Sequence, residues 1–271
     1  MHQIRQPAVA GAFYPAQESI LARDVAALLS YAQPVTAATT PTPKAIIVPH
    51  AGYAYSGHTA ALAYARMAAG RKTIHHIVLL GPVHRVPVRG LALPGVDFFA
   101  TPLGKIEIDH DAVATISHLP QVMVSHAAHA MEHSLEVQLP FLQAVLDDFK
   151  LLPLAVGDAS AGEVAQVLET VWGGSETLIV VSSDLSHFLP YRLAQVMDEQ
   201  TVQAILNLNG SLNHEQACGG TPINGLLLAA AKHRLVPRLL GSCNSGDSAG
   251  DRQCVVGYAS FAFEEGPEHV H

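Results

Sequence analysis

Apolar and polar positions alternate along this chain in blocks that predict an α/β fold. Short apolar runs over 44–49, 76–81, 151–156, 177–182 and 254–263 are typical of buried strands. Apolar residues recur at helical spacing over 18–32, 57–69, 109–118, 134–149, 160–172, 192–208 and 221–233. This alternation predicts three layers: a mostly parallel, mixed central sheet with helices on both of its faces.

The domain organisation follows from the connecting segments. Residues 33–43 form a Pro/Thr-rich loop, which is too close to the start of the chain to separate two domains. We therefore expect one domain over 1–271, with an N-terminal arm over 1–16. The short alternating segment 103–109 is a candidate edge strand, and Pro140 is expected to bend or start the helix predicted over 134–149.

Composition narrows the classes of partner. The 271 residues are 49% hydrophobic, and 15 basic against 23 acidic groups leave a formal charge of −8, which argues against nucleic acid or an anionic membrane as a partner. We see neither a run of about 20 apolar residues that would span a bilayer nor a signal peptide. The three cysteines are too few, and odd in number, for a disulfide framework, so we expect a cytoplasmic protein.

Candidate chemistry begins with histidines at the ends of two predicted strands. His50 follows the run over 44–49, and His84 follows the run over 76–81. In an open α/β sheet, ligands bind outside the carboxyl ends of the strands, so these imidazoles are expected to meet there. Two histidines with a carboxylate are a known ligand set for non-haem iron. The alternative is that each is an ordinary loop histidine bonded to a backbone carbonyl.

A second candidate is the segment SSDLSHF, directly after the predicted strand over 177–182. Asp184 and His187 would lie on one side of a helical turn, where the carboxylate could orient the imidazole as a general acid or base. The alternative is helix capping, because Ser183 and Asp184 are both good N-cap residues.

A weaker candidate is MEHSLEVQLPF, where Glu132 and His133 precede a predicted buried helix. Substrate contact or support of other ligands is possible there, but no local metal-ligand spacing is present. The loop GSCNSGDSAGDRQ adds Asp247, Asp251 and Cys243, any of which could complete a site begun by His50 and His84, although such loops are usually plain turns. No phosphate-binding or dinucleotide motif and no nucleophile elbow is found, so we expect no nucleotide cofactor.

Taken together, these motifs resemble the Memo family. The resemblance rests on RQPAVAGAFYP at 5–15, PHAGYAYSG at 49–57, GPVHR at 81–85, EHSLEVQLPFLQ at 132–143, SSDLSHF at 182–188 and VVGYASFAF at 255–263. Prokaryotic members are often called AmmeMemoRadiSam system protein B, after their association with a radical-SAM protein and an AMMECR-type protein. The resemblance implies those partners and a fold like that of the class III extradiol ring-cleaving dioxygenases.

The resemblance also implies roles for individual residues. The histidines that match His50 and His84 are metal ligands, and the one that matches His187 is the acid/base of the dioxygenases. Animal members take a third ligand, a cysteine, from the loop before the last strand; here that position falls on or beside Ser248. Asp247 is the nearest replacement, and if no side chain serves, metal binding would be weak or lost.

These inferences combine into one leading hypothesis and two alternatives. The leading hypothesis is a metal-binding protein of the Memo family, with Fe(II), or else Cu or Zn, held by His50, His84 and Asp247. The expected catalytic residues are His187, Asp184 and His133, and the expected substrate-pocket residues, for an unknown small molecule, are Tyr53, Tyr55, Arg85, Glu132 and Cys243. The alternatives are a non-catalytic metal-binding partner of the radical-SAM system and a metal-dependent hydrolase.

Overall fold

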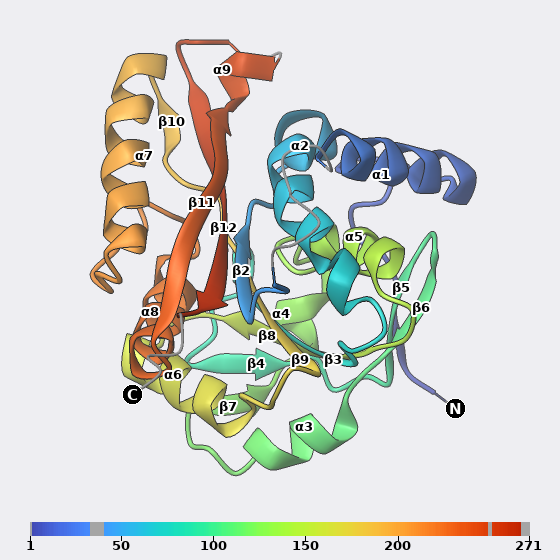
Figure 1. The fold of residues 1–271 in the computed structure, drawn as a ribbon. Coiled ribbons are helices and arrows are strands. Elements are labelled where there is room, and N and C mark those ends of the chain that lie inside the picture. The colour runs from blue at the N-terminus through green and yellow to red at the C-terminus, as the bar shows by residue number, and fades with distance from the viewer. Residues whose placement is uncertain (1, 33–40, 249–250, 267–271) are drawn as a thin grey trace.

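The computed structural model describes residues 2–32, 41–248 and 251–266 (Figure 1). The expected loop over 33–43 therefore lies outside the described residues, apart from 41–43. The strands are β1 Ile4–Arg5, β2 Ala45–Val48, β3 His76–Pro82, β4 Leu91–Leu93, β5 Phe98–Thr101, β6 Gly104–Glu107, β7 Val122–Val124, β8 Lys150–Val156, β9 Thr177–Ser182, β10 His187–Leu189, β11 Leu235–Asn244 and β12 Val255–Glu265.

The helices lie between these strands and confirm the α/β class. They are α1 Glu18–Ala32, α2 Tyr53–Tyr64, α3 His110–Ile116, α4 His126–Ala130, α5 Leu139–Val145, α6 Ala161–Thr170, α7 Tyr191–Leu206, α8 Gly220–Lys232 and α9 Ser245–Ser248, with 3-10 turns η2 Ala65–Gly70 and η3 Glu136–Gln138. Within the described ranges, no helix is both long enough and apolar enough to span a bilayer.

The main sheet is mixed, with a parallel centre. Its strand order is β10-β12-β2-β9-β3-β8-β4-β7, with β11 paired to β12. The central strands β2, β9, β3 and β8 run parallel to one another, whereas β12 runs antiparallel to β2, β10 and β11. Because β2, β3 and β9 point the same way, their carboxyl ends meet at one edge of the sheet.

Alternate residues of each strand enter two separate cores, one on each face of the sheet. Ile46 of β2 and Leu79 of β3 belong to the core that includes residues of α1, α2 and α5. Ile47 and Leu80, the next residues along, belong to the core that includes residues of α6 and α8. Strands buried on both faces read as continuous apolar runs, which is why they could be recognised in the sequence.

Several predicted helices are found at their expected places. The helix α1 has the predicted bounds, and α6 follows the N-cap Ser160, whose hydroxyl accepts from the amide of Glu163 in a capping box. The segment 134–149 differs from the single helix that was predicted there. It contains the turn η3 and then the short helix α5, with Pro140 in the first turn of α5. Pro140 starts this helix because its missing N–H costs nothing in a first turn.

Two segments were predicted wrongly. The chain after β9 does not form a helical turn, because 183–186 has no regular structure and His187 begins β10. The hypothesis of helix capping by Ser183 or Asp184 is also not supported, since α7 begins after Pro190. Part of the predicted loop over 241–253 is the end of β11, and its Ser245–Ser248 is the helix α9.

The N-terminal arm is fixed to the molecule by one buried carboxylate. The side chain of Glu136 pairs with Arg5 and accepts hydrogen bonds from the amides of Ala8 and Val9 and from the hydroxyl of Tyr14. In addition, β1 pairs with β5, which with β6 completes a small second sheet; the edge strand expected over 103–109 is β6. The arm therefore supports the segment that carries Glu132 and His133.

Candidate metal centre

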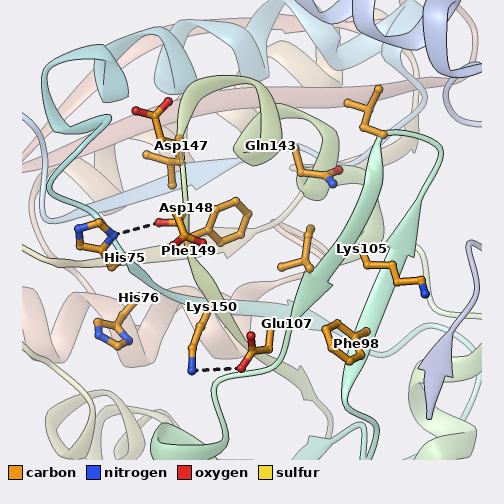
Figure 2. Close-up of a pocket in the computed structure, with 13 residues that line it drawn as sticks. His75, His76, Phe98, Lys105, Glu107, Gln143, Asp147, Asp148, Phe149 and Lys150 are labelled. Atoms are coloured by element: carbon orange, nitrogen blue, oxygen red, sulfur yellow. Dashed lines mark hydrogen bonds and ion pairs between the residues drawn. The ribbon is translucent and has the colours of Figure 1, made fainter. Parts of the chain in front are cut away.

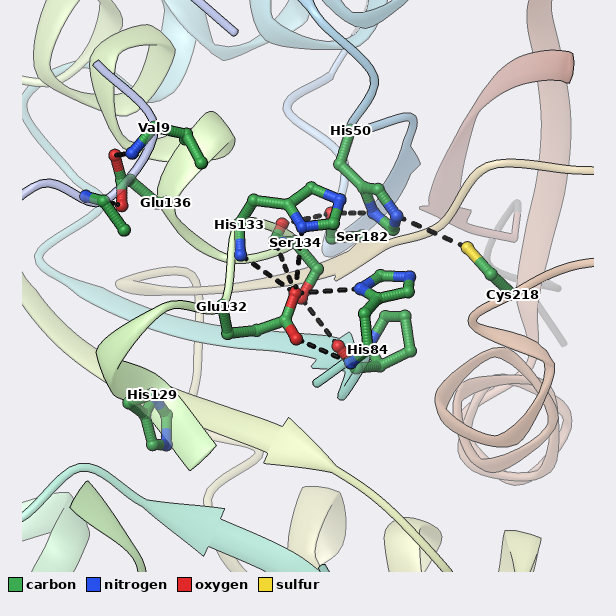
Figure 3. Close-up of polar contacts among 12 residues, drawn as sticks. Val9, His50, His84, His129, Glu132, His133, Ser134, Glu136, Ser182 and Cys218 are labelled. Carbon is green, nitrogen blue, oxygen red and sulfur yellow. Dashed lines mark hydrogen bonds and ion pairs between the residues drawn. The ribbon is translucent and has the colours of Figure 1, made fainter. Parts of the chain in front are cut away.

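Three histidines converge at the carboxyl edge of the central strands. His50 lies just after β2, His84 lies just after β3, and His133 lies between α4 and η3. One ring nitrogen from each lies within 4.8 Å of the other two. The ring centroids are separated by 5.3 Å for His50 and His84, 5.4 Å for His50 and His133, and 4.6 Å for His84 and His133 (Figure 3).

The tautomer of His50 follows from its hydrogen bonds. Its Nδ1 lies 2.9 Å from Oγ of Ser182. That hydroxyl donates its one proton to the carbonyl of Ser134, at 2.6 Å, and already accepts from the side-chain amide of Gln138. Nδ1 of His50 must therefore donate, which leaves the lone pair on Nε2. Burial and the neighbouring His133 and His84 lower the pKa of His50 far below its ordinary value, so the ring is neutral.

Glu132 fixes His84 in the same tautomer. One carboxylate oxygen lies 2.8 Å from Nδ1 of His84 and also accepts from the amides of His133 and Ser134, at 2.9 Å each. The other oxygen accepts from the amide of His84, at 2.6 Å. Burial would raise the pKa of Glu132, but these hydrogen bonds outweigh it and lower the pKa to about 2. An ionised carboxylate must receive a proton from Nδ1, so the lone pair of His84 is also on Nε2.

Asp184 and His187 lie in the segment that follows β9. The carboxylate of Asp184 accepts from the amide of His50 at 2.7 Å, and burial raises its pKa to about 7. Nδ1 of His187 lies 2.9 Å from the carbonyl of Leu185, so Nε2 is free to accept a proton. Burial lowers the pKa of His187, against a smaller opposing effect of the hydrogen bond to the carbonyl of Leu185. The sequence led us to expect that Asp184 orients the ring of His187. In the structure, Asp184 instead orients the backbone of His50.

The expected third ligand, Asp247, is placed elsewhere. In the described part of the chain, the group of nearby donor atoms contains His133 and not Asp247. The carboxylate of Asp247 accepts from the hydroxyl of Tyr191 at 2.5 Å and from the amide of Asn244 at 2.9 Å. These bonds hold the carboxylate against the start of α7 and the end of β11, outside the group of three histidine donors.

The expected substrate-pocket residues do not form one group. Tyr53 belongs to the core, where it donates to the carbonyl of Val137 at 2.8 Å. Sγ of Cys243 lies 3.1 Å from Oγ1 of Thr59 and is outside the histidine group. Tyr55 is exposed. Arg85 is also exposed. Burial, and to a smaller extent the charge of Arg85, lowers the pKa of His133. Glu132 is in the site, where it orients histidines.

Sequence reasoning missed Cys218. Its sulfur lies 3.3 Å from Nε2 of His50, and the residue lies two positions before the start of α8 (Figure 3). Burial raises the pKa of the Cys218 thiol to about 12. The dipeptide Cys218-Gly219 carries no metal-binding spacing, so no local signal pointed to it.

The donor set fits a transition-metal ion. Neutral imidazole nitrogens are good ligands for Fe, Cu, Zn and Ni. In known metal sites, the second ring nitrogen of a ligating histidine is usually bonded to a carboxylate or another acceptor. His50 and His84 show this arrangement, with Ser182 and Glu132 as the acceptors.

A separate cavity of about 660 Å³ lies at the opposite edge of the sheet (Figure 2). Its lining includes His76 and Lys150, which begin β3 and β8. Its polar groups contact one another: Lys150 lies 3.1 Å from Glu107, and Nδ1 of His75 lies 3.0 Å from the carbonyl of Asp148. No set of convergent unpaired groups is evident among these residues.

The fold and the three-histidine group define a class of α/β protein with a candidate metal site. The family model described as "Memo-like protein" matches residues 5–262. A MEMO1 family protein of Aquifex aeolicus is 36% identical over 273 residues, covering 96% of this chain and 99% of the relative. A MEMO1 family protein of Archaeoglobus fulgidus is 34% identical over 278 residues, with the same coverage of both chains. This chain therefore belongs to the Memo family.

Solved structures confirm the fold. The crystal structure of an uncharacterized protein of Escherichia coli K12 matches with a TM-score of 0.52 and 14% identity, covering 80% of this chain and 98% of that one. A likeness at this identity concerns the fold alone. The predicted three-layer α/β architecture is confirmed, and it is consistent with the extradiol-dioxygenase-like fold that the resemblance implied.

Proposed function

We propose that this Memo-family protein binds a first-row transition-metal ion through His50, His84 and His133. One observation supports the proposal most strongly: buried acceptors fix Nδ1–H of both His50 and His84, so both Nε2 lone pairs are available at the same place. Fe(II) is the ion expected from the resemblance to the dioxygenases, and Cu and Zn suit the same donors.

The neighbouring groups support metal-assisted chemistry on a small oxygenated molecule. A bound ion would act as a Lewis acid that polarises an oxygen of such a molecule. His187, with Nδ1–H bonded to Leu185, presents a basic Nε2 that would accept or return a proton. The buried Asp184 holds the backbone of His50 in position. These residues supply orientation and proton transfer, and a turnover screen with and without added Fe(II) or Zn²⁺ would separate an oxygenase from a hydrolase.

The test of the proposal is metal analysis of protein purified without oxygen and under reducing conditions. We expect about one transition-metal ion per chain in the wild type and loss of that ion in His50→Ala. His118→Ala is the matched control, because His118 is exposed and outside the group. Wild-type protein without a transition metal, or undiminished metal in His50→Ala, would overturn the proposal.

Partner proteins are a second part of the proposal. The family resemblance implies association with a radical-SAM protein and an AMMECR-type protein. Co-purification of these proteins with the tagged chain, together with a blank turnover screen on the metal-loaded protein, would favour the role of a non-catalytic metal-binding partner.

A further inference from the structure

A phenyl ring next to the candidate acid or base is left in solvent. Phe188 directly follows His187 in β10, and 72% of its surface is exposed. Among the large apolar side chains of the described residues, it is the most exposed. A single exposed apolar residue is ordinary on a protein surface, so the exposure alone indicates nothing. The backbone that carries this ring is what makes it informative.

The backbone of Phe188 is strained. Its φ is +59°, in the left-handed region that glycine adopts freely and that a bulky side chain disfavours. A phenylalanine is therefore kept at a position where glycine would relieve the strain, and its ring is not buried in return. Strain of this kind is typically found at functional sites.

A β-bulge is the origin of this conformation. His187 lies opposite Val256 of β12. Leu189 lies opposite Val255, the adjacent residue of β12, so Phe188 is an extra residue in β10. Figure 1 shows β10 beside β12 and α7. Bulges near active sites often serve to redirect a side chain.

The bulge brings two consecutive rings together. In a regular strand, neighbouring side chains point to opposite faces of the sheet. Here the ring centroids of His187 and Phe188 are 5.6 Å apart, at an interplanar angle of 67°. The exposed phenyl ring therefore lies against the imidazole to which the proposed function gives proton transfer.

His187 in turn connects Phe188 to the candidate ligands. Besides burial and the charges of His133 and His84, the charge of His187 lowers the pKa of His50, so these rings are near one another. Nδ1 of His187 is held by the carbonyl of Leu185, which leaves Nε2 for a bound molecule. A molecule that reaches this nitrogen would have the phenyl ring beside it.

We propose that Phe188 is a specificity-determining residue that packs on an apolar part of the molecule bound at the histidine group. This inference rests on the proposed metal binding and names the class of ligand: an oxygen group that binds the metal, joined to an apolar body of about the size of a ring. Binding would remove the apolar surfaces of both partners from water and would add the contact between rings.

The test uses two hydroxamates that share one chelating group. Acetohydroxamate carries a methyl group and benzohydroxamate carries a phenyl ring. Their binding to Co²⁺-loaded protein is followed by the visible spectrum of the ion. We expect Phe188→Gly to weaken the binding of benzohydroxamate by about 3- to 10-fold and to leave that of acetohydroxamate unchanged. Phe188→Tyr keeps a ring and should bind both like the wild type.

The matched control is Met123→Ala, because Met123 is also exposed but lies in β7, the strand at the other end of the main sheet. This variant should bind both hydroxamates like the wild type. Equal weakening of both hydroxamates by Phe188→Gly, or no weakening of benzohydroxamate, would overturn the inference and leave the proposed metal binding intact. So would a Co²⁺-loaded wild type that binds neither hydroxamate, whereas a wild type that binds no Co²⁺ would refute both proposals.

Urea unfolding of the metal-free proteins distinguishes a role in binding from a role in folding. Glycine adopts a positive φ without strain, so we expect the unfolding midpoint of Phe188→Gly to be equal to or above that of the wild type. A clearly lower midpoint would show that the ring stabilises the fold itself, and it would overturn the inference.

Discussion

The orienting role of Glu132 leads to a prediction that separates metal affinity from folding. In Glu132→Gln, one carboxylate oxygen becomes an NH₂ group. Because Oε1 accepts three N–H bonds and Oε2 accepts one from the amide of His84, either orientation of the glutamine places a donor against a donor. A buried N–H left without an acceptor costs about 1–3 kcal/mol, so the metal-free variant should be less stable by about that amount.

Metal affinity should fall in addition, because Glu132 holds Nδ1–H of His84 and makes its Nε2 a better ligand. Loss of such a partner typically lowers affinity about 10- to 100-fold, which corresponds to about 1.4–2.7 kcal/mol. The assay is competition of the metal against a chelator of known affinity. It should be combined with urea unfolding of both metal-free proteins, so that the loss of stability is measured separately.

The matched control is Glu199→Gln. Glu199 is exposed, and its hydrogen bond is with Gln203 on the surface of α7. We expect this variant to match the wild type in both affinity and stability. The reasoning would be refuted if folded Glu132→Gln bound metal as tightly as the wild type, because Glu132 would then play no part in preparing His84.

Three further predictions concern the frame around the site. Glu136→Gln should lower the unfolding free energy by about 3 kcal/mol, since it leaves the buried Arg5 without its counter-charge. Urea unfolding would measure this loss, and an unchanged unfolding midpoint would contradict the prediction. Burial lowers the pKa of His129 to about 4, so between pH 6.5 and 4 the native state binds fewer protons than the unfolded chain. The unfolding free energy should therefore fall by up to about 3 kcal/mol as the pH drops from about 6.5 to 4. His129→Leu should reduce this fall, and the same dependence on pH in both proteins would show that His129 does not cause it. Gly90→Ala should destabilise the fold by about 3 kcal/mol or more, because φ is +80° and the new Cβ would lie 2.0 Å from the carbonyl oxygen of Gln121; thermal unfolding near that of the wild type would count against it.

The main sheet could be predicted because its central strands are buried on both faces. Such strands read as continuous apolar runs, as in β3 and β9. The strand β11 was missed for the opposite reason: most of its residues are partly or fully exposed, and it contains Pro237 and Gly241. It pairs with β12 alone, so its sequence lacks the apolar pattern of a central strand.

The candidate site was predictable only where its residues follow strands directly. His50 and His84 are placed by β2 and β3, whose carboxyl ends must meet. His133 and Cys218 are brought to the site by long-range packing of loops. Such packing produces no recognisable metal-ligand spacing in the sequence. Asp247 was chosen by counting along a loop, and such counting cannot foresee that Tyr191 and a backbone amide bind its carboxylate.

The site is built so that each segment is fixed by polar groups of another segment. Asp184 receives the amide of His50, Glu132 receives the amide of His84, and the hydroxyl of Ser134 donates to the carbonyl of Pro82 at 2.8 Å. These bonds involve buried groups and need no ion to form. Because this framework orders the candidate ligands without an ion, binding of an ion would cost little conformational entropy, and the free energy of metal–ligand bonding would be available for affinity and for selecting the ion.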